Sequence, residues 1–135
     1  MANKQIAELT FLDDIYYFEE HTWAKLEGDT VRVGITDFAQ DNLGDIIFIE
    51  LPQVGESFDK GEEFGQAESA KTVSSLYMPV SGEIVEVNDQ LEDAPENVNS
   101  SPYQEGWMIV VKARDPEELK NLLSKDDYIK MISNG

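Results

Sequence analysis

The amino-acid sequence predicts a mainly β domain, an antiparallel sandwich or flattened barrel with a helical cover. Two observations lead to this fold class. Many short runs rich in β-branched and aromatic residues are separated by glycine and proline turn signals. The strongest helix-start signals stand near the carboxyl end of the chain, around residue 115. At 135 residues the chain forms a single domain, which is long enough to bury a core without disulfides or metal.

Residues 1–14 show no sustained hydrophobic period, and we expect an arm with one short ordered segment. The β core is predicted over 15–113, and it begins with an aromatic cluster that forms an early strand. The members of this cluster are Tyr16, Tyr17, Phe18, His21 and Trp23. A turn signal at 27–29 separates this strand from the next, in which Val31, Val33 and Ile35 alternate with polar or small residues.

A short helix is predicted next, over 37–43. Thr36 supplies its amino-terminal cap and Gly44 ends it. The apolar run over 46–51 predicts a strand buried on both faces, which Pro52 stops.

Turns at 53–56 and 59–62 lead into a predicted hairpin. One strand begins at Phe64, the turn lies at 69–72, and the second strand ends at Tyr77. Another strand covers 84–87. We expect a loop without an apolar run over 88–102 and the last strand over 107–111.

The carboxyl end is predicted to be helical over 115–133. Asp115 is a cap, Pro116 suits the first helical position, and acidic residues follow in the first turn. Ser124, with Asp127 three residues later, caps a second helical segment.

The composition excludes several classes of function. The chain has no cysteine and one histidine, so disulfide frameworks, thiolate zinc sites and histidine clusters are not expected. Because the chain has so few side chains of the kinds used in catalysis, we do not expect it to be an enzyme. No run approaches the ~20 apolar residues of a membrane span, and no signal peptide is evident. We therefore expect a soluble cytoplasmic protein that does not bind membranes.

The chain is strongly acidic. Its 28 acidic and 10 basic residues give a formal net charge of −18. Such a charge repels phosphates, so nucleic acid is not an expected partner. The acidity favours docking onto basic surfaces of partner proteins, or it reflects a saline or alkaline habitat, and the sequence does not separate these two explanations.

Lys71 is the candidate functional residue. It is the only basic residue between Lys60 and Lys112, and it lies in the predicted turn of the hairpin among small and hydroxyl-bearing residues. A lysine at a loop tip is usually just a solvated charge. One that protrudes from a hairpin with ordered flanking strands also suits covalent modification by another enzyme.

Separated motifs then make the chain resemble the H protein of the glycine cleavage system. In order they are GITDFAQ (34–40), LGDIIFIELP (43–52), FG (64–65), ESAK (68–71), YMPVSGE (77–83), VEVN (85–88), NSSPY (99–103) and GWM (106–108). Several motifs in the right order are far more specific than a single one.

The resemblance implies a barrel-sandwich hybrid, the architecture of lipoyl and biotinyl carriers. It also implies a lipoyl group in amide linkage to Lys71. The lipoate-attaching enzyme would recognise Glu68 and Ser69. Biotin is disfavoured, because Ala70 and Thr72 stand where biotin carriers typically have methionines. The chain would then be a non-catalytic carrier, whose arm is reoxidised by dihydrolipoamide dehydrogenase.

Two departures from the family pattern bear on the cargo. Members of the family typically have the sequence His-Glu-Trp where this chain has His21-Thr22-Trp23. They also have an acidic residue at the position of Ser75. Those carboxylates are associated with holding the charged amine of an aminomethyl cargo. We therefore treat His21, Thr22 and Ser75 as candidates for the cleft that receives the arm.

The missing carboxylates favour a lipoate-binding protein of oxidative sulfur metabolism, serving a heterodisulfide-reductase-like complex whose cargo has no amine. The alternative is a conventional H protein, which shuttles aminomethyl between glycine decarboxylase and aminomethyltransferase. Other acidic residues would then hold the amine.

Two further classes remain open on the residues alone. An enzyme would need His21 to act with Asp13, Asp14 or Glu20, the only candidate constellation. An unmodified binding module would not need the intact Glu68, Ser69 and Lys71.

Overall fold

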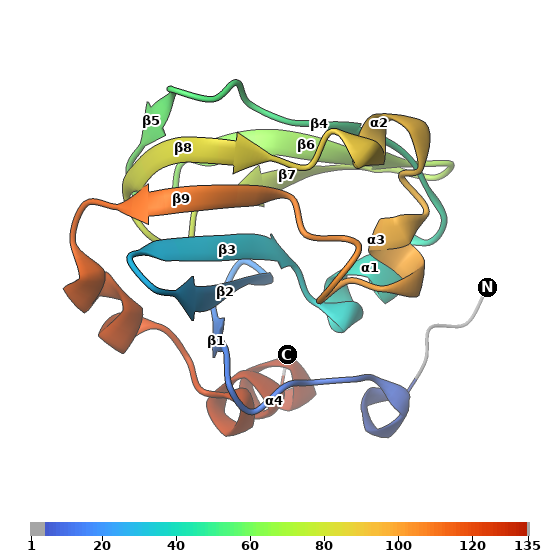
Figure 1. Ribbon diagram of the computed structural model, residues 1–135. Coiled ribbons are helices and arrows are strands. Elements are labelled where there is room, and N and C mark those ends of the chain that lie inside the picture. The colour runs from blue at the N-terminus through green and yellow to red at the C-terminus, as the bar shows by residue number, and fades with distance from the viewer. Residues whose placement is uncertain (1–4, 135) are drawn as a thin grey trace.

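The computed structural model describes residues 5–134 and confirms the mainly β prediction. A six-stranded antiparallel sheet has the order β1-β2-β3-β9-β8-β5, and a three-stranded sheet has the order β4-β6-β7 (Figure 1). The strands are β1 (Tyr16–Tyr17), β2 (Thr22–Glu27), β3 (Thr30–Ile35), β4 (Ile46–Glu50), β5 (Ser57–Phe58), β6 (Glu63–Ser69), β7 (Val73–Tyr77), β8 (Gly82–Val87) and β9 (Ile109–Ala113). The helices are η1 (Ile6–Glu8), α1 (Asp37–Leu43), α2 (Gln90–Asp93), α3 (Asn97–Ser100), η2 (Pro116–Asn121) and α4 (Lys125–Asn134).

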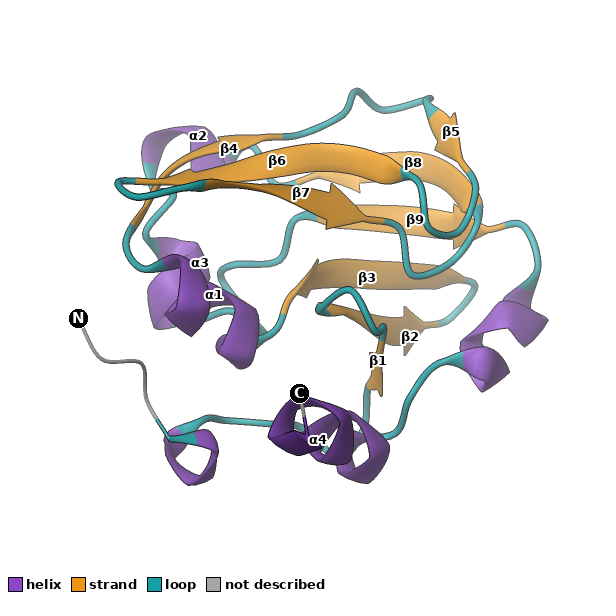
Figure 2. Ribbon diagram, turned by 180° about the vertical axis from the view of Figure 1, so that it is seen from behind, coloured by secondary structure: helices purple, strands orange, loops and turns teal. Residues whose placement is uncertain are grey.

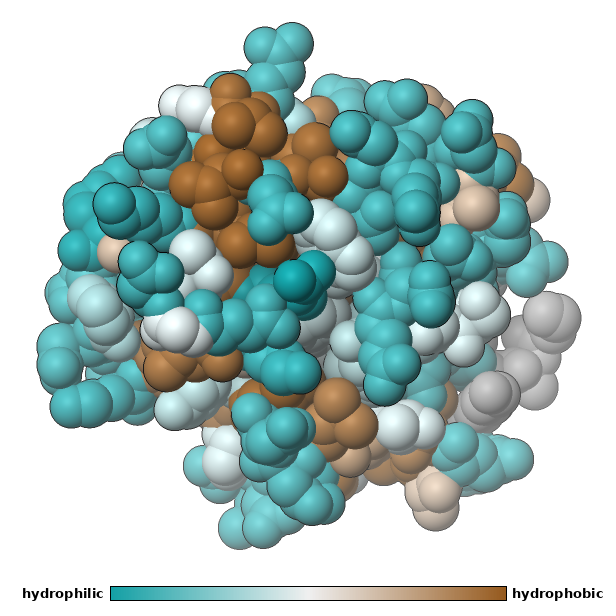
Figure 3. Space-filling view, in the orientation of Figure 1, coloured by the Kyte–Doolittle hydropathy of each residue, from teal (hydrophilic) through white to brown (hydrophobic). Residues whose placement is uncertain are grey.

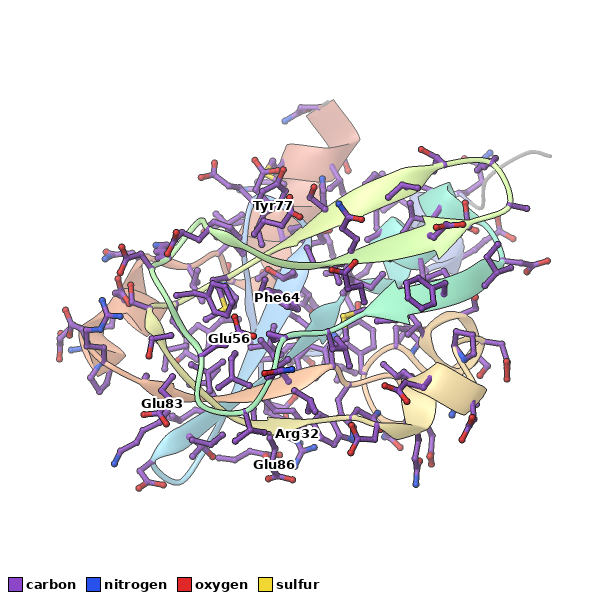
Figure 4. The ribbon with its side chains drawn as sticks, turned by 90° about the horizontal axis from the view of Figure 1, so that it is seen from above. Arg32, Glu56, Phe64, Tyr77, Glu83 and Glu86 are labelled. Carbon is purple, nitrogen blue, oxygen red and sulfur yellow. The ribbon has the colours of Figure 1, made fainter. Side chains whose placement is uncertain are left out.

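The main core joins the two sheets. Val33 of β3 and Ile84 of β8 belong to the same buried cluster as Phe64 of β6 and Leu76 of β7. The polar-apolar alternation in β3 gives it this buried face, as the sequence predicts. Figure 4 views the molecule from above and places Phe64 near the middle, whereas Glu83 and Glu86 of β8 lie toward the rim.

Helix α1 forms as the sequence predicts. The Thr36 hydroxyl oxygen accepts from the Ala39 amide at 3.1 Å, which satisfies one of the free N–H groups of the first turn. Gly44 ends the helix at φ 82°, and its amide donates to the Gln40 carbonyl. Glycine adopts this positive φ without a steric penalty.

A second cluster joins the amino-terminal segment to α4. The rings of Tyr17 and Tyr128 stack with centroids 4.9 Å apart, and Phe11 meets both rings edge-on. The Ser124 hydroxyl caps α4 by accepting from the Asp127 amide at 3.2 Å, as predicted. In Figures 1 and 2, α4 and η1 lie beyond the β1–β2 edge of the larger sheet. Residues 1–4 of the predicted arm lie outside the described residues.

The prediction for 46–51 was wrong in one respect. Strand β4 is an edge strand of the three-stranded sheet, and Ile47 and Phe48 are about half exposed rather than buried. A register irregularity between Ile46 and Phe48 leaves Ile46 and Ile49 as the buried residues. An uninterrupted apolar run therefore does not mean burial on both faces here.

The prediction of a plain loop over 88–102 was also wrong. This segment contains α2 and α3, each of four residues, and each buries one side chain, Leu91 and Val98. Two isolated apolar residues give no periodic pattern, so the sequence does not reveal that they belong to the core.

Smaller differences concern element type and limits. The helix after Asp115 is a 3-10 helix, although Asp115 caps it as expected by accepting from the Glu117 amide. Strand β9 begins at Ile109, two residues later than predicted. Trp107 lies before the strand, with the Arg32 guanidinium 4.5 Å from its ring centroid. The aromatic cluster spans two strands, β1 and β2, with His21 in the turn between them.

Figure 3 shows a face that is mostly hydrophilic, with hydrophobic side chains gathered over β8 and the loop above it. In the part of the chain that the structure describes, every helix is too short or too polar to span a bilayer.

Candidate functional site

The β6–β7 hairpin holds Lys71 at its tip. The Ser69 amide donates to the Thr72 carbonyl at 2.8 Å, and this bond closes the turn. The buried Ser69 hydroxyl accepts from the amides of Lys71 and Thr72 at 3.3 and 3.2 Å. Such a side-chain bond is typical of serine in tight turns. Ser69 thus fixes the turn, while Lys71 and Glu68 are exposed at its surface.

The side chain of Lys71 leans toward the end of α1. Its Cε atom lies 3.6 Å from the position that a Cβ on Gly44 would occupy. Within residues 5–134 no acidic side chain forms an ion pair with Lys71. Figure 2 shows the β6–β7 turn on the same side of the molecule as α1 and α3. The amine is therefore accessible and starts beside α1.

A groove of about 150 Å³ runs along α1. Its lining residues are Glu20, His21, Thr22, Ile35, Ala39, Asn42, Leu43, Ser74, Ser75 and Leu76. The three cleft candidates of the sequence analysis, His21, Thr22 and Ser75, therefore meet in one groove. They come from three places in the chain: the β1–β2 turn, β2 and β7.

The groove has an apolar part and a polar part. Ile35, Leu43 and Leu76 offer aliphatic surface, whereas hydroxyls, one amide, the imidazole and one carboxylate supply the polar groups. The buried Thr22 hydroxyl is already engaged, because it donates to the Tyr77 carbonyl at 3.0 Å. Thr22 thus shapes the groove by joining β2 to the end of β7.

His21 is held from several sides. It adopts φ 73°, a conformation that is uncommon for residues other than glycine. Its Nδ1 lies 2.8 Å from the Tyr128 hydroxyl, which lies 2.8 Å from the Thr36 hydroxyl, and its ring packs against Phe38. Burial lowers the pKa of His21 below its ordinary 6.5, and the nearby Glu20 carboxylate opposes this shift more weakly. At neutral pH the uncharged form of the imidazole therefore predominates.

The lowered pKa predicts a pH dependence of stability. The unfolded chain binds this proton more readily than the folded chain, so the stabilisation is fully present above about pH 6.5 and falls as pH drops toward the folded pKa. His21→Asn removes this titration, and asparagine tolerates positive φ. Urea unfolding between about pH 5 and 7.5 should show a shallower acid loss of stability for His21→Asn than for the native chain. Identical slopes would contradict the assigned environment of His21.

The acidic residues considered as partners of His21 lie in different surroundings. Asp13 pairs with Lys125 at 2.6 Å, and His21 uses Nδ1 for Tyr128 rather than for a carboxylate. No cluster of three or more metal-ligating side chains occurs within the described range, 5–134. Of the three acidic partners considered, Glu20 is the one that lines the groove with His21.

The sequence analysis did not place Glu20 in the cleft. Its adjacency to His21 was the available signal, but neighbouring residues in a turn can point to opposite sides. Glu19 does not line this groove, but it lines two other hollows of the surface, one of them together with His21 and Phe38.

The two β sheets, with a lysine held out on a hairpin beside a groove, define a barrel-sandwich hybrid of the carrier type. A model of the glycine cleavage H-protein family matches residues 15–135. The chain therefore belongs to the glycine cleavage H-protein family.

Individual relatives agree with this assignment. The glycine cleavage system H protein of Halalkalibacterium halodurans is 57% identical over 121 residues, which cover 90% of this chain and 94% of that protein. That of Bacillus licheniformis is 56% identical over 119 residues, covering 88% and 94%. A crystal structure of a glycine cleavage system H protein from Mycobacterium marinum is 39% identical, with a TM-score of 0.84, and the match covers 91% of this chain and 99% of that one.

These comparisons bear on the two hypotheses about the cargo that the arm carries. The relatives at this level of identity have the name of the conventional H protein, and none of those reported above has a name that refers to sulfur metabolism. They support a conventional H protein, the alternative in the sequence analysis, better than the lipoate-binding protein of sulfur metabolism that the sequence analysis favoured.

Proposed function

We propose that the chain carries a lipoyl group in amide linkage to Nζ of Lys71 and shuttles an aminomethyl group between glycine decarboxylase and aminomethyltransferase. The observation that carries the proposal is the accessible amine of Lys71, held at a hairpin tip beside a groove with an apolar part. The H-protein family membership supports the same function.

The residues present fit this group. The exposed tip lets the lipoate-attaching enzyme reach Lys71, and Glu68, exposed three residues earlier, is available for recognition by that enzyme. Ser69 keeps the turn in one conformation, so the amine is presented at a fixed place. The aliphatic side chains of Ile35, Leu43 and Leu76 suit a mostly apolar arm.

The chain acts as a non-catalytic carrier in this proposal. The dithiolane of the lipoyl group supplies the redox and group-carrying chemistry. Fixed attachment at Lys71 raises the effective concentration of the cargo at each docked partner. Dihydrolipoamide dehydrogenase, which restores the disulfide, is the remaining partner.

Reconstitution with glycine decarboxylase tests the proposal. The lipoylated chain should gain the aminomethyl mass and support glycine-dependent release of CO₂, whereas the unlipoylated chain should do neither. A lipoylated chain that gains no mass with glycine, but gains mass with a sulfur-oxidising complex and a reduced sulfur donor, would overturn the assignment of the cargo.

A further inference from the structure

The three-stranded sheet exposes apolar side chains near the hairpin tip. Within residues 5–134, five large apolar side chains are exposed, and three of them, Ile47, Phe48 and Val73, belong to β4 and β7 of this sheet. The other two, Leu26 and Val54, lie in β2 and in the loop after β4. Single apolar residues on a surface need no explanation, whereas a group of them marks an interaction surface.

Phe48, Glu68 and Val73 form one row across this sheet. Glu68 of β6 is paired with Phe48 of β4 on one side and with Val73 of β7 on the other. Residues that lie directly opposite each other point to the same face, with about 5 Å between their Cβ atoms. All three side chains are exposed. Two apolar groups therefore flank one carboxylate beside the turn that carries Lys71.

A β-bulge in β4 produces this exposure. The register gives β4 one extra residue, Ile47, between the pairs that Ile46 and Phe48 form with β6. Strict alternation would bury one of two neighbouring residues, yet Ile47 and Phe48 are both about half exposed, while Ile46 and Ile49 stay in the core. Bulges commonly re-aim side chains beside functional sites. This bulge turns two apolar side chains outward at the level of the hairpin tip.

The place of these side chains indicates which partner covers them. An enzyme that acylates Lys71 must bring its reacting group to Nζ, which stands only a four-carbon stem away from the turn. That stem lies against Gly44, two residues before β4 begins, so the amine starts on the β4 side of the tip. The acylating enzyme must therefore come close to the start of β4, whereas an enzyme that acts on the far end of an attached arm can stay farther away.

We propose that Ile47, Phe48 and Val73 form a docking surface for the lipoate-attaching enzyme, with Glu68 opposite a basic group of that enzyme. The inference rests on the proposed function and adds apolar anchors on β4 and β7 to the recognition of the hairpin. Phe48 and Val73 bury their apolar surface against the enzyme. Glu68 has no ion pair within the described residues, and the net charge of −18 also favours a basic partner surface.

The test measures attachment to the unlipoylated chain with lipoyl adenylate as the donor. In this reaction the Lys71 nitrogen forms an amide with the lipoyl carbonyl carbon, the bond to AMP breaks, and the nitrogen loses a proton. Phe48→Ser should raise KM for the chain about tenfold, because a large apolar contact is lost, and should leave kcat within about twofold of the native value. Phe48→Leu keeps most of the apolar area and should hold KM within about threefold.

Leu26→Ser and Val54→Ser are the matched controls. Leu26 is 51% exposed, as is Phe48, and the β2–β3 turn lies at the end of the molecule opposite the hairpin tip (Figure 1). Both controls should keep the native KM, whereas Val73→Ser should raise it about threefold. The midpoint of urea unfolding should shift no more in Phe48→Ser than in Leu26→Ser. Once fully lipoylated, all these proteins should be reoxidised equally fast by dihydrolipoamide dehydrogenase, which acts on the far end of the arm.

A second pair of variants tests the charge. Glu68→Gln should raise KM and weaken its dependence on salt, because the proposed basic partner group faces Glu68. Glu83→Gln makes the same change of net charge at an exposed position of β8 and should leave KM and its salt dependence at the native level.

The outcomes are distinct. Phe48→Ser and Val73→Ser proteins with the KM of the controls would overturn the docking surface, as would a fall in kcat at unchanged KM, and either result leaves the proposed function intact. A native chain that gains no lipoyl mass overturns the proposed function, and this inference with it.

Discussion

Lys71→Arg is expected to abolish lipoyl attachment, and therefore all glycine-dependent loading, while the fold stays intact. An amide bond needs a neutral amine nitrogen, and the guanidinium of arginine stays protonated in proteins. The side chain at 71 is exposed and has no ion pair within the described residues, so the free energy of unfolding should change by less than about 0.5 kcal/mol. Intact mass after expression with a lipoate-attaching enzyme measures the attachment, and urea unfolding measures the stability.

Lys112→Arg is the matched control for this variant. Lys112 lies exposed in β9, away from the hairpin, and its replacement should leave attachment and loading at the native level. A Lys71→Arg protein that still gains the lipoyl mass would show that another group is the acceptor.

Gly65→Ala should lower the free energy of unfolding by about 3 kcal/mol, because it forces β4 and β6 apart. A Cβ on Gly65 would overlap the carbonyl oxygen of Glu50, which is backbone and cannot move alone. Gly65 also lies at the register irregularity between β6 and β7. Since β6 carries the hairpin, we expect lipoyl attachment to weaken as well. Urea unfolding followed by tryptophan fluorescence, with attachment measured by intact mass, checks both effects.

Gly28→Ala is the comparison for this change. Gly28 has φ 66° in the β2–β3 turn, but no atom beyond its two chain neighbours lies within 4 Å of the Cβ position. The same added methyl group therefore meets only backbone strain, about 1–2 kcal/mol. Equal losses in the two variants would show that the close approach of Glu50 does not limit the structure.

The parts of the fold with local signals were predictable from the sequence. Helix α1 follows from Thr36 and Gly44, and β3 follows from its alternating residues, because caps and periodicity are encoded within a few neighbouring positions. Leu91, Val98 and the exposure of Phe48 were not predictable in this way. Whether these side chains are covered depends on which strands lie beside them, and that is a property of the whole sheet.

Some residues of the candidate site were likewise predictable from the sequence, and others were not. Lys71 stood out because it is isolated within a turn, and the hairpin confirms its position. His21, Thr22 and Ser75 were grouped only through the family resemblance, and the structure brings them to one groove. Glu20 needed the structure, because the turn that gives His21 its positive φ also decides which neighbouring side chain enters the groove.

Peptide mapping of the native chain, expressed with lipoate and its attaching enzyme, tests most directly whether Lys71 carries the arm. Trypsin does not cleave after an acylated lysine, and Lys60 and Lys112 are the nearest basic residues on either side of Lys71. We predict one continuous peptide over 61–112 that bears the lipoyl mass at Lys71. Cleavage after Lys71, with the lipoyl mass on a peptide that contains another lysine, would contradict the assignment of Lys71 as the attachment site.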